Sequence, residues 1–107
     1  MRATLLVPPE LLNRVVEYFR PRRVVLFGSR ARGDSGPDSD FDLLVILDDD
    51  APADRLTLRA GWESRRGYDR PVDVVPVREG VYRRRAKIAG TLAYEAEIDG
   101  IAVYERA

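Results

Sequence analysis

Apolar residues along the chain follow two different spacings, which separate predicted helices from predicted strands. After Pro8 and Pro9, apolar side chains recur at positions 11, 12, 15, 16 and 19, the spacing of one helix face. Pro21 ends this predicted helix. Residues 24–27 and 40–47 are short, mainly apolar runs, which is typical of buried strands.

The middle of the chain continues this alternation. Polar residues at positions 34–39 predict a loop between the first two strands. Residues 51–66 favour a helix, although Gly61 lowers the helix propensity of the segment. Residues 71–77 predict a third strand, and Pro76 indicates that this strand lies at a sheet edge or leaves the sheet.

The last third of the chain is predicted to be helical and then extended. Residues 78–99 have helical spacing, with an apolar face made by Val81, Ile88, Leu92 and Ala96. Gly90 is expected to kink or divide this helix, and residues 101–104 predict a short final strand. This order of elements predicts an α/β fold on a small sheet, with residues 1–107 forming a single domain.

The composition narrows the chemistry that such a domain can perform. The 107 residues include no Cys and no His, which excludes disulfides, thiol nucleophiles, imidazole bases and His-ligated zinc. The 18 basic and 18 acidic residues balance, so direct nucleic-acid binding is not expected. Without a long apolar run or a signal peptide, we expect a cytoplasmic protein with no membrane contact.

Three polar features interrupt the apolar strands, and each has an ordinary structural explanation when taken alone. Gly28 and Ser29 follow the first strand, where glycine lets a backbone approach a phosphate, but an ordinary turn is more frequent. Asp40 and Asp42 lie about 6.6 Å apart on one strand face, either in solvent or around a cation. Asp73 either faces solvent on an edge strand or faces the same site as that pair.

Taken together, the three features predict a site for divalent cations. Three carboxylates on neighbouring strands beside a Gly-Ser phosphate cradle suit two divalent ions roughly 4 Å apart. Oxygen ligands favour Mg²⁺ or Mn²⁺ over zinc, which agrees with the lack of His and Cys. The 30 residues between Asp42 and Asp73 are enough for one helical crossover between two strands.

The same residues carry a family resemblance. They are Val25-Leu26-Phe27-Gly28-Ser29-Arg30-Ala31-Arg32-Gly33, then Ser39-Asp40-Phe41-Asp42-Leu43-Leu44-Val45, then Val72-Asp73-Val74-Val75. These segments resemble the DNA polymerase β-type nucleotidyltransferase superfamily and, within it, the minimal nucleotidyltransferases, the MNT or MntA-type antitoxins paired with HEPN toxins. The ending Ile98-Asp99-Gly100-Ile101-Ala102-Val103-Tyr104-Glu105 extends the resemblance, which is weakest over residues 51–70.

The resemblance implies a fold and a reaction. The fold is a small mixed β-sheet flanked by helices, in which the first two strands form a hairpin-like pair and the third lies beside the second. The reaction transfers a nucleoside monophosphate from a nucleoside triphosphate, here AMP from ATP, with Mg²⁺ or Mn²⁺ at two positions. The core motif shows no departure from the family pattern, so loss of activity is not indicated.

The resemblance also implies a role for each motif residue. Gly28 and Ser29 would hold the triphosphate, and Arg32 would support the loop or touch a phosphate. Asp40 and Asp42 would ligate both metal ions. Asp73 would ligate the catalytic ion and accept the proton of the acceptor hydroxyl.

A partner protein is the acceptor that the resemblance implies. We expect AMPylation of a tyrosine hydroxyl on a HEPN-type toxin, since a chain of this size leaves no room for an acceptor-binding domain. Two alternatives stay open: a non-catalytic antitoxin that acts by binding, and a nucleotide-binding subunit of a larger transferase. The complete set of Asp40, Asp42 and Asp73 favours the enzyme.

Basic residues outside the motif can be explained either as ordinary solvent-exposed residues or as parts of a binding surface. The run Arg83–Arg85 with Lys87 is typical of a solvated helix face, although it would also suit an acidic partner or RNA. Arg65, Arg66 and Arg70 precede the third strand and form either a polar loop or a surface that faces the triphosphate.

The large aromatic residues are interpreted mainly as core. Trp62 and Tyr82 are expected inside the protein rather than as platforms for a nucleobase. Tyr94 and Tyr104 are expected in the core or at the edge of an interface.

Overall fold

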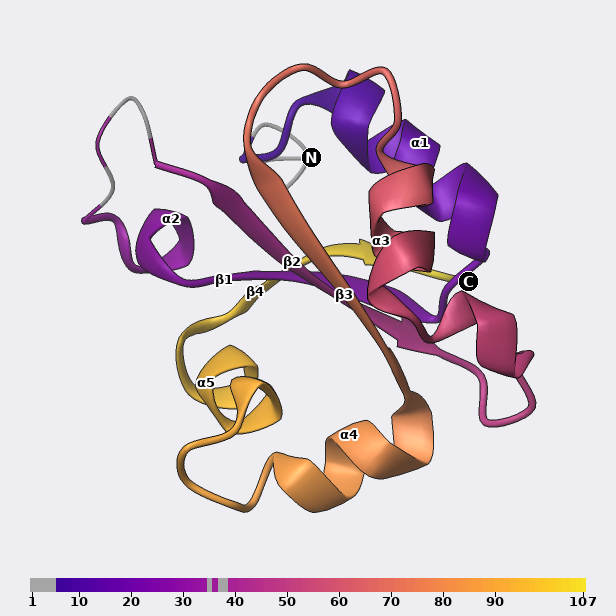
Figure 1. Cartoon of the computed structure of the whole chain (residues 1–107). Coiled ribbons are helices and arrows are strands. Elements are labelled where there is room, and N and C mark those ends of the chain that lie inside the picture. The colour runs from indigo at the N-terminus through magenta and orange to yellow at the C-terminus, as the bar shows by residue number, and fades with distance from the viewer. Residues whose placement is uncertain (1–5, 35, 37–38) are drawn as a thin grey trace.

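A mixed β-sheet with helices on both faces forms the framework of the computed structural model, which describes residues 6–34, 36 and 39–107 (Figure 1). The elements in chain order are α1 (Pro9–Phe19), β1 (Arg23–Phe27), α2 (Ser29–Arg32), β2 (Phe41–Leu47), the short 3₁₀ helix η2 (Ala53–Arg55), α3 (Leu58–Ser64), β3 (Val72–Arg78), α4 (Glu79–Arg85), α5 (Leu92–Asp99) and β4 (Ile101–Glu105).

The strand pairing follows the arrangement that the family resemblance implies. In the described residues the sheet has the order β3-β2-β1-β4. Strands β1 and β2 are antiparallel neighbours, and β3 runs parallel to β2 on its other side. The segment that contains α3 makes the crossover between these parallel strands. The prediction of an α/β fold with a small mixed sheet flanked by helices is therefore confirmed.

Each face of the sheet is covered by its own pair of helices. Helices α1 and α3 lie on one face, and α4 and α5 lie on the other (Figure 1). Helix α1 buries the apolar stripe expected from the sequence, namely Leu11, Leu12, Val15 and Phe19. Burial of each such side chain contributes roughly 1.5–3 kcal/mol, which holds α1 firmly against the sheet.

Strand β3 is an edge strand, and its outer side is partly covered. A Cβ atom added to Gly61 of α3 would overlap the carbonyl oxygen of Val74, so this helix packs directly against the strand backbone. Pro76 lies within the strand and has no amide hydrogen to offer to another chain. These two features limit pairing of a further strand at this edge.

Two long predicted helices are each divided in the structure. The segment 51–66 forms η2 and then α3, because the Thr57 side chain accepts a hydrogen bond from the amide of Ala60 and starts a new helix. The segment 78–99 forms α4 and α5, with Gly90 at a φ of 93° between them and Thr91 as the N-cap of α5. A helix cannot continue through a residue with positive φ.

The division of the second helix changes which side chains are buried. Ile88 lies between the two helices and Leu92 begins α5, and both are about half exposed. Tyr82, Ala93 and Ala96 pack against the sheet instead. The predicted single apolar face across residues 81–96 was therefore wrong, because it assumed one continuous helical phase.

The helices are too short or too polar to cross a membrane in the part of the chain that the structure describes.

Candidate functional site

The ends of three neighbouring strands bring two carboxylates together. Asp42 in β2 is in register with Asp73 in β3, and on its other side it is opposite Phe27 of β1. Alternation along β2 places Asp42 on the face that carries Leu44, and alternation along β3 places Asp73 on the face that carries Val75. The two carboxylates thus share the face of the sheet that α4 and α5 cover.

Burial and neighbouring negative charges change the acidity of Asp42. Burial, followed by the negative charges of Asp73 and Asp40, raises the pKa of Asp42 from 3.8 to about 6. A hydrogen bond with Asp73 adds to this rise, and the positive charge of Arg32 opposes it. The site therefore favours either a proton or a cation at Asp42.

Gly28 leaves the space that the Asp42 carboxylate fills. A Cβ atom added at Gly28 would overlap Oδ2 of Asp42, and Gly28 has a φ of 79°. Only glycine adopts this backbone conformation without strain while allowing such a close approach. Gly28 is the N-cap of α2, and Ser29 is the first residue of that single helical turn. Gly28 of the predicted Gly-Ser segment thus lies directly against the Asp42 carboxylate.

Asp40 is close to Asp42 in the sequence but lies outside the sheet. Strand β2 begins at Phe41, so Asp40 lies just before the strand rather than within it as expected. Asp40 is exposed, in the loop before the strand, because pairing with β3 in the register starts at Phe41. Its charge nevertheless reaches Asp42 and contributes to the raised pKa of that carboxyl.

The two arginines of the motif have different contacts. Arg32 is exposed, and its Nε donates to Asp34 at 3.3 Å. The guanidinium of Arg30 donates instead to the carbonyl oxygen of Ser39, next to Asp40. Sequence reasoning missed Arg30 because nothing in the motif distinguishes the two arginines; their different contacts arise from the fold.

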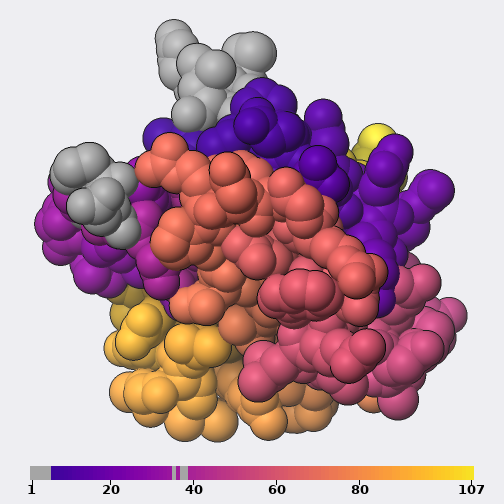
Figure 2. Space-filling view, turned by 45° about the horizontal axis from the view of Figure 1, so that its top comes forward, coloured from indigo at the N-terminus to yellow at the C-terminus, as the bar shows by residue number. Residues whose placement is uncertain are grey.

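A cavity of about 420 Å³ opens beside the two carboxylates. Its walls come from β1, β2, β3, α3 and α5, and the lining residues are Phe27, Asp42, Leu58, Gly61, Trp62, Arg65, Val72, Asp73, Val74, Val75 and Leu92. Figure 2 shows this face, where the orange segment around β3 lies between the pink residues of α3 and the yellow residues of α5. The cavity gives a second molecule access to Asp42 and Asp73.

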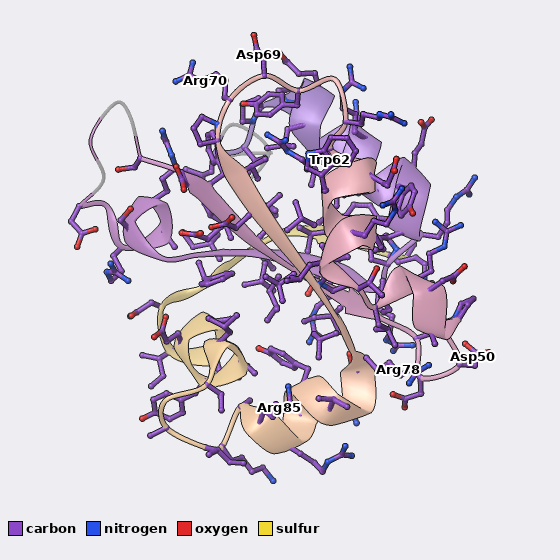
Figure 3. All side chains as sticks on the ribbon, in the orientation of Figure 1. Asp50, Trp62, Asp69, Arg70, Arg78 and Arg85 are labelled. Carbon is purple, nitrogen blue, oxygen red and sulfur yellow. The ribbon has the colours of Figure 1, made fainter. Side chains whose placement is uncertain are left out.

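Trp62 differs from its expected place. Its side chain is 50% exposed and projects from α3 (Figure 3), whereas Tyr82 is only 5% exposed, as expected for a core residue. Trp62 lines the cavity together with Leu58 and Leu92, which are also exposed. An amphipathic helix pattern predicts which residues can be buried, but α3 covers only the edge strand and leaves Trp62 outside.

The other basic candidates lie in different parts of the molecule. Arg65 lines the cavity, and its Nη2 donates to the carbonyl oxygen of Arg70 at 2.6 Å. Arg70 and Asp69 project from the loop between α3 and β3, away from the sheet (Figure 3). The run Arg83–Arg85 is exposed in the last turn of α4, as expected for a solvated face.

The donor atoms of the site suit a divalent cation in type. Asp42, Asp73 and Asp40 offer oxygen ligands only, and their mutual repulsion is relieved by a cation. In the residues that the structure describes, no group of three or more carboxylates is already arranged to hold a metal ion.

Known proteins share this fold. Residues 9–99 match the nucleotidyltransferase domain family, and no curated protein gives a significant match. The chain is similar to a candidate nucleotidyltransferase from Sulfolobus solfataricus, with 24% identity, a TM-score of 0.60, and coverage of 98% of this chain and 82% of that chain. It is also similar to a toxin-antitoxin crystallised with AMP-PNP, with 20% identity, a TM-score of 0.59, and coverage of 94% of this chain and 75% of that chain.

Proposed function

Because the chain belongs to the nucleotidyltransferase domain family, we propose that it transfers AMP from ATP to a hydroxyl of a partner protein. The observation that carries this proposal is the pairing of Asp42 with Asp73 in register, with Gly28 directly against Asp42. Two carboxylates on adjacent strands serve no packing purpose, and their repulsion costs stability. A site for a divalent cation and a phosphate group explains their placement.

Each motif residue has a role in this proposal. Asp40 and Asp42 would hold both divalent ions, and Asp73 would hold one of them. Gly28 and Ser29 hold the triphosphate through backbone amides and a hydroxyl, with Arg32 adding positive charge nearby. Mg²⁺, or Mn²⁺ in its place, would neutralise charge on the attacking and leaving oxygens.

The bond changes follow from these positions. Asp73 accepts the proton of the acceptor hydroxyl as its oxygen attacks the α-phosphorus of ATP. The bond between the α-phosphorus and the bridging oxygen breaks, and pyrophosphate leaves in line with the attack. The products are a phosphodiester between AMP and the acceptor oxygen, and pyrophosphate.

The cavity beside Asp73 supports a macromolecular acceptor. It is bordered by three exposed apolar side chains, those of Leu58, Trp62 and Leu92. Exposed apolar residues around a reacting group are typical of a surface that contacts another protein. The toxin-antitoxin structure with AMP-PNP supports a toxin as this partner and an adenine nucleotide as the donor. We propose a HEPN-type toxin, modified on a tyrosine hydroxyl in the cytoplasm.

The proposal is tested with the protein encoded in the neighbouring reading frame. After incubation with this chain, ATP and Mg²⁺, that protein should gain the mass of one or more AMP groups, and EDTA should abolish the gain. It should also stay inactive after this chain is removed. Undiminished transfer with all divalent metal removed would refute the metal site.

The alternative of an antitoxin that acts by binding predicts a different result. The partner would then recover its activity on separation, without a change in mass. A variant with both Asp40→Ala and Asp42→Ala would still neutralise it. Such an outcome would remove the proposed enzyme activity and leave a binding protein.

A further inference from the structure

The side chain of Arg30 reaches across the site to the backbone next to Asp40. Its Nε and Nη2 donate to the carbonyl oxygen of Ser39 at 3.0 Å and 2.7 Å. The guanidinium carbon lies 4.1 Å from the centre of the Phe41 ring. Arg30 therefore contacts the residue before Asp40 and the residue after it.

The sheet does not fix the position of Asp40, so the contact of Arg30 with the neighbouring backbone matters for its placement. It precedes β2 and is exposed, whereas Phe41 pairs with β3 and its amide donates to the carbonyl oxygen of Pro71 at 3.3 Å. The peptide between Ser39 and Asp40 is therefore fixed on one side by Arg30 and on the other by the first residue of the strand. Without Arg30, nothing in the described contacts of Ser39 ties its carbonyl to the rest of the site.

The contact uses properties that arginine has and lysine lacks. Two N–H groups of one flat guanidinium converge on a single carbonyl oxygen. The face of the same group stacks on the Phe41 ring, which is itself buried. A lysine at this position would keep the positive charge but would lose the second hydrogen bond and the stacking.

We propose that Arg30 is a positioning residue that holds Asp40 in place by binding the carbonyl of Ser39 while stacked on Phe41. The role rests on the proposed function, because it assumes that Asp40 ligates a divalent ion. Arg30 also belongs to α2, which begins directly after Gly28. The side chain thus links the segment proposed to bind phosphate with the segment that carries Asp40.

The test measures Mn²⁺ binding by the chain from the loss of the electron paramagnetic resonance signal of the free ion, beyond the loss that the nucleotide alone causes. The probe mixture is Mn²⁺ with an ATP analogue whose α,β-bridge is a methylene group, so that no transfer occurs. Arg30→Lys should weaken Mn²⁺ binding about tenfold, as expected when a group that orients a ligand is lost. Phe41→Leu should weaken it in the same direction, since it removes the ring that supports the guanidinium.

Arg59→Lys is the matched control. It makes the same substitution at an arginine that is 85% exposed, with one ion pair to Glu63 at 3.9 Å. It should bind Mn²⁺ as the unmodified chain does. Thermal melting of every variant checks that the fold is intact.

A kinetic measurement separates positioning from direct phosphate binding. If Arg30 positions Asp40, raising Mn²⁺ should restore kcat in Arg30→Lys, while KM for ATP at saturating Mn²⁺ stays near that of the unmodified chain. If Arg30 binds the triphosphate, the KM for ATP rises and added Mn²⁺ does not restore it, which overturns the positioning role.

The outcomes of the binding test distinguish this role from the proposed function. Equal Mn²⁺ affinity in Arg30→Lys and the unmodified chain would overturn the role of Arg30 alone. Absence of Mn²⁺ binding by the unmodified chain would overturn the metal site and the role of Arg30 with it.

Discussion

At Asp42 the requirements of folding and of the proposed chemistry conflict. The residue continues a strand whose other members are almost all buried and apolar, and it faces a second carboxylate in register. Its pKa, raised to about 6, records the cost of burying this charge and, next, of keeping it beside Asp73 and Asp40. Such a cost is typical of functional sites rather than of structural ones.

We predict that Asp42→Asn stabilises the metal-free fold while removing AMP transfer. The folded chain holds the Asp42 proton more tightly than the unfolded chain does, so ionisation of Asp42 lowers stability. This loss is absent below about pH 4 and complete above about pH 6. Thermal melting in EDTA should therefore show a gain for Asp42→Asn of about 1 kcal/mol near neutral pH, allowing for solvent screening, and little change near pH 4.

Asp50→Asn is the control for this prediction, because Asp50 is exposed and lies beyond the last residue of β2, whereas Asp42 lies near the first (Figure 3). It should change the melting temperature little at either pH. A stability gain in Asp42→Asn that is equal at both pH values would contradict the cost assigned to the ionisation of Asp42.

Gly28 and Gly33 form a natural pair for testing the close approach to Asp42. Both have positive φ, 79° and 83°, but only a side chain at Gly28 meets the Asp42 carboxylate. Alanine costs roughly 1–2 kcal/mol of backbone strain in the left-handed conformation of Gly33. It costs more at Gly28, whose ψ of −158° lies in a region that is essentially restricted to glycine. We predict that Gly28→Ala loses more stability than Gly33→Ala in urea denaturation and also loses AMP transfer. Similar losses in both variants would show that the contact with Asp42 is unimportant.

Among the secondary-structure elements, α3 shows how packing overrides helix propensity. Gly61 lies in the middle of this helix, where alanine normally gains about 1 kcal/mol of helix stability. A side chain at this position would overlap the carbonyl oxygen of Val74 in β3. The helix therefore depends on the glycine to pack closely against the edge strand.

We predict that Gly61→Ala destabilises the protein by about 1–3 kcal/mol in urea denaturation, opposite in sign to its effect on an isolated helix. The control is Arg59→Ala in the same helix, an exposed position where the change should stay within about 0.5 kcal/mol. A gain in stability for Gly61→Ala would mean that α3 does not rest on the strand as described.

Helices and strands were predicted correctly where a single local sequence feature defines their ends. Helix α1 and strand β1 matched their predicted bounds closely, because proline and a simple apolar pattern define them. The predicted helix over residues 51–66 was too long, since the Thr57 cap decides where α3 begins. Likewise, Gly90 divides α4 from α5 through its positive φ, whereas the apolar spacing alone continues through it.

In the whole molecule, the candidate site depends on sheet topology. Asp42 and Asp73 are far apart in sequence, and parallel pairing of β2 with β3 puts them in register. Composition and spacing indicated the chemistry of these residues, and the structure brings them together with Gly28. Asp40 lies outside the strand because strand pairing begins only at Phe41. Trp62 is exposed because no other element in the described part of the chain covers that side of α3. A local sequence pattern determines neither of these limits.

The central claim is that this chain transfers the α-phosphoryl portion of a nucleotide, as AMP, to a protein. It is tested most directly by incubating the chain, Mg²⁺ and the protein from the neighbouring reading frame with ATP labelled at either the α-phosphate or the γ-phosphate. The account predicts protein-bound label from the α-phosphate and none from the γ-phosphate, with no label in either case for Asp42→Asn. Protein-bound γ-label, or neutralisation of the partner without any bound label, would contradict it.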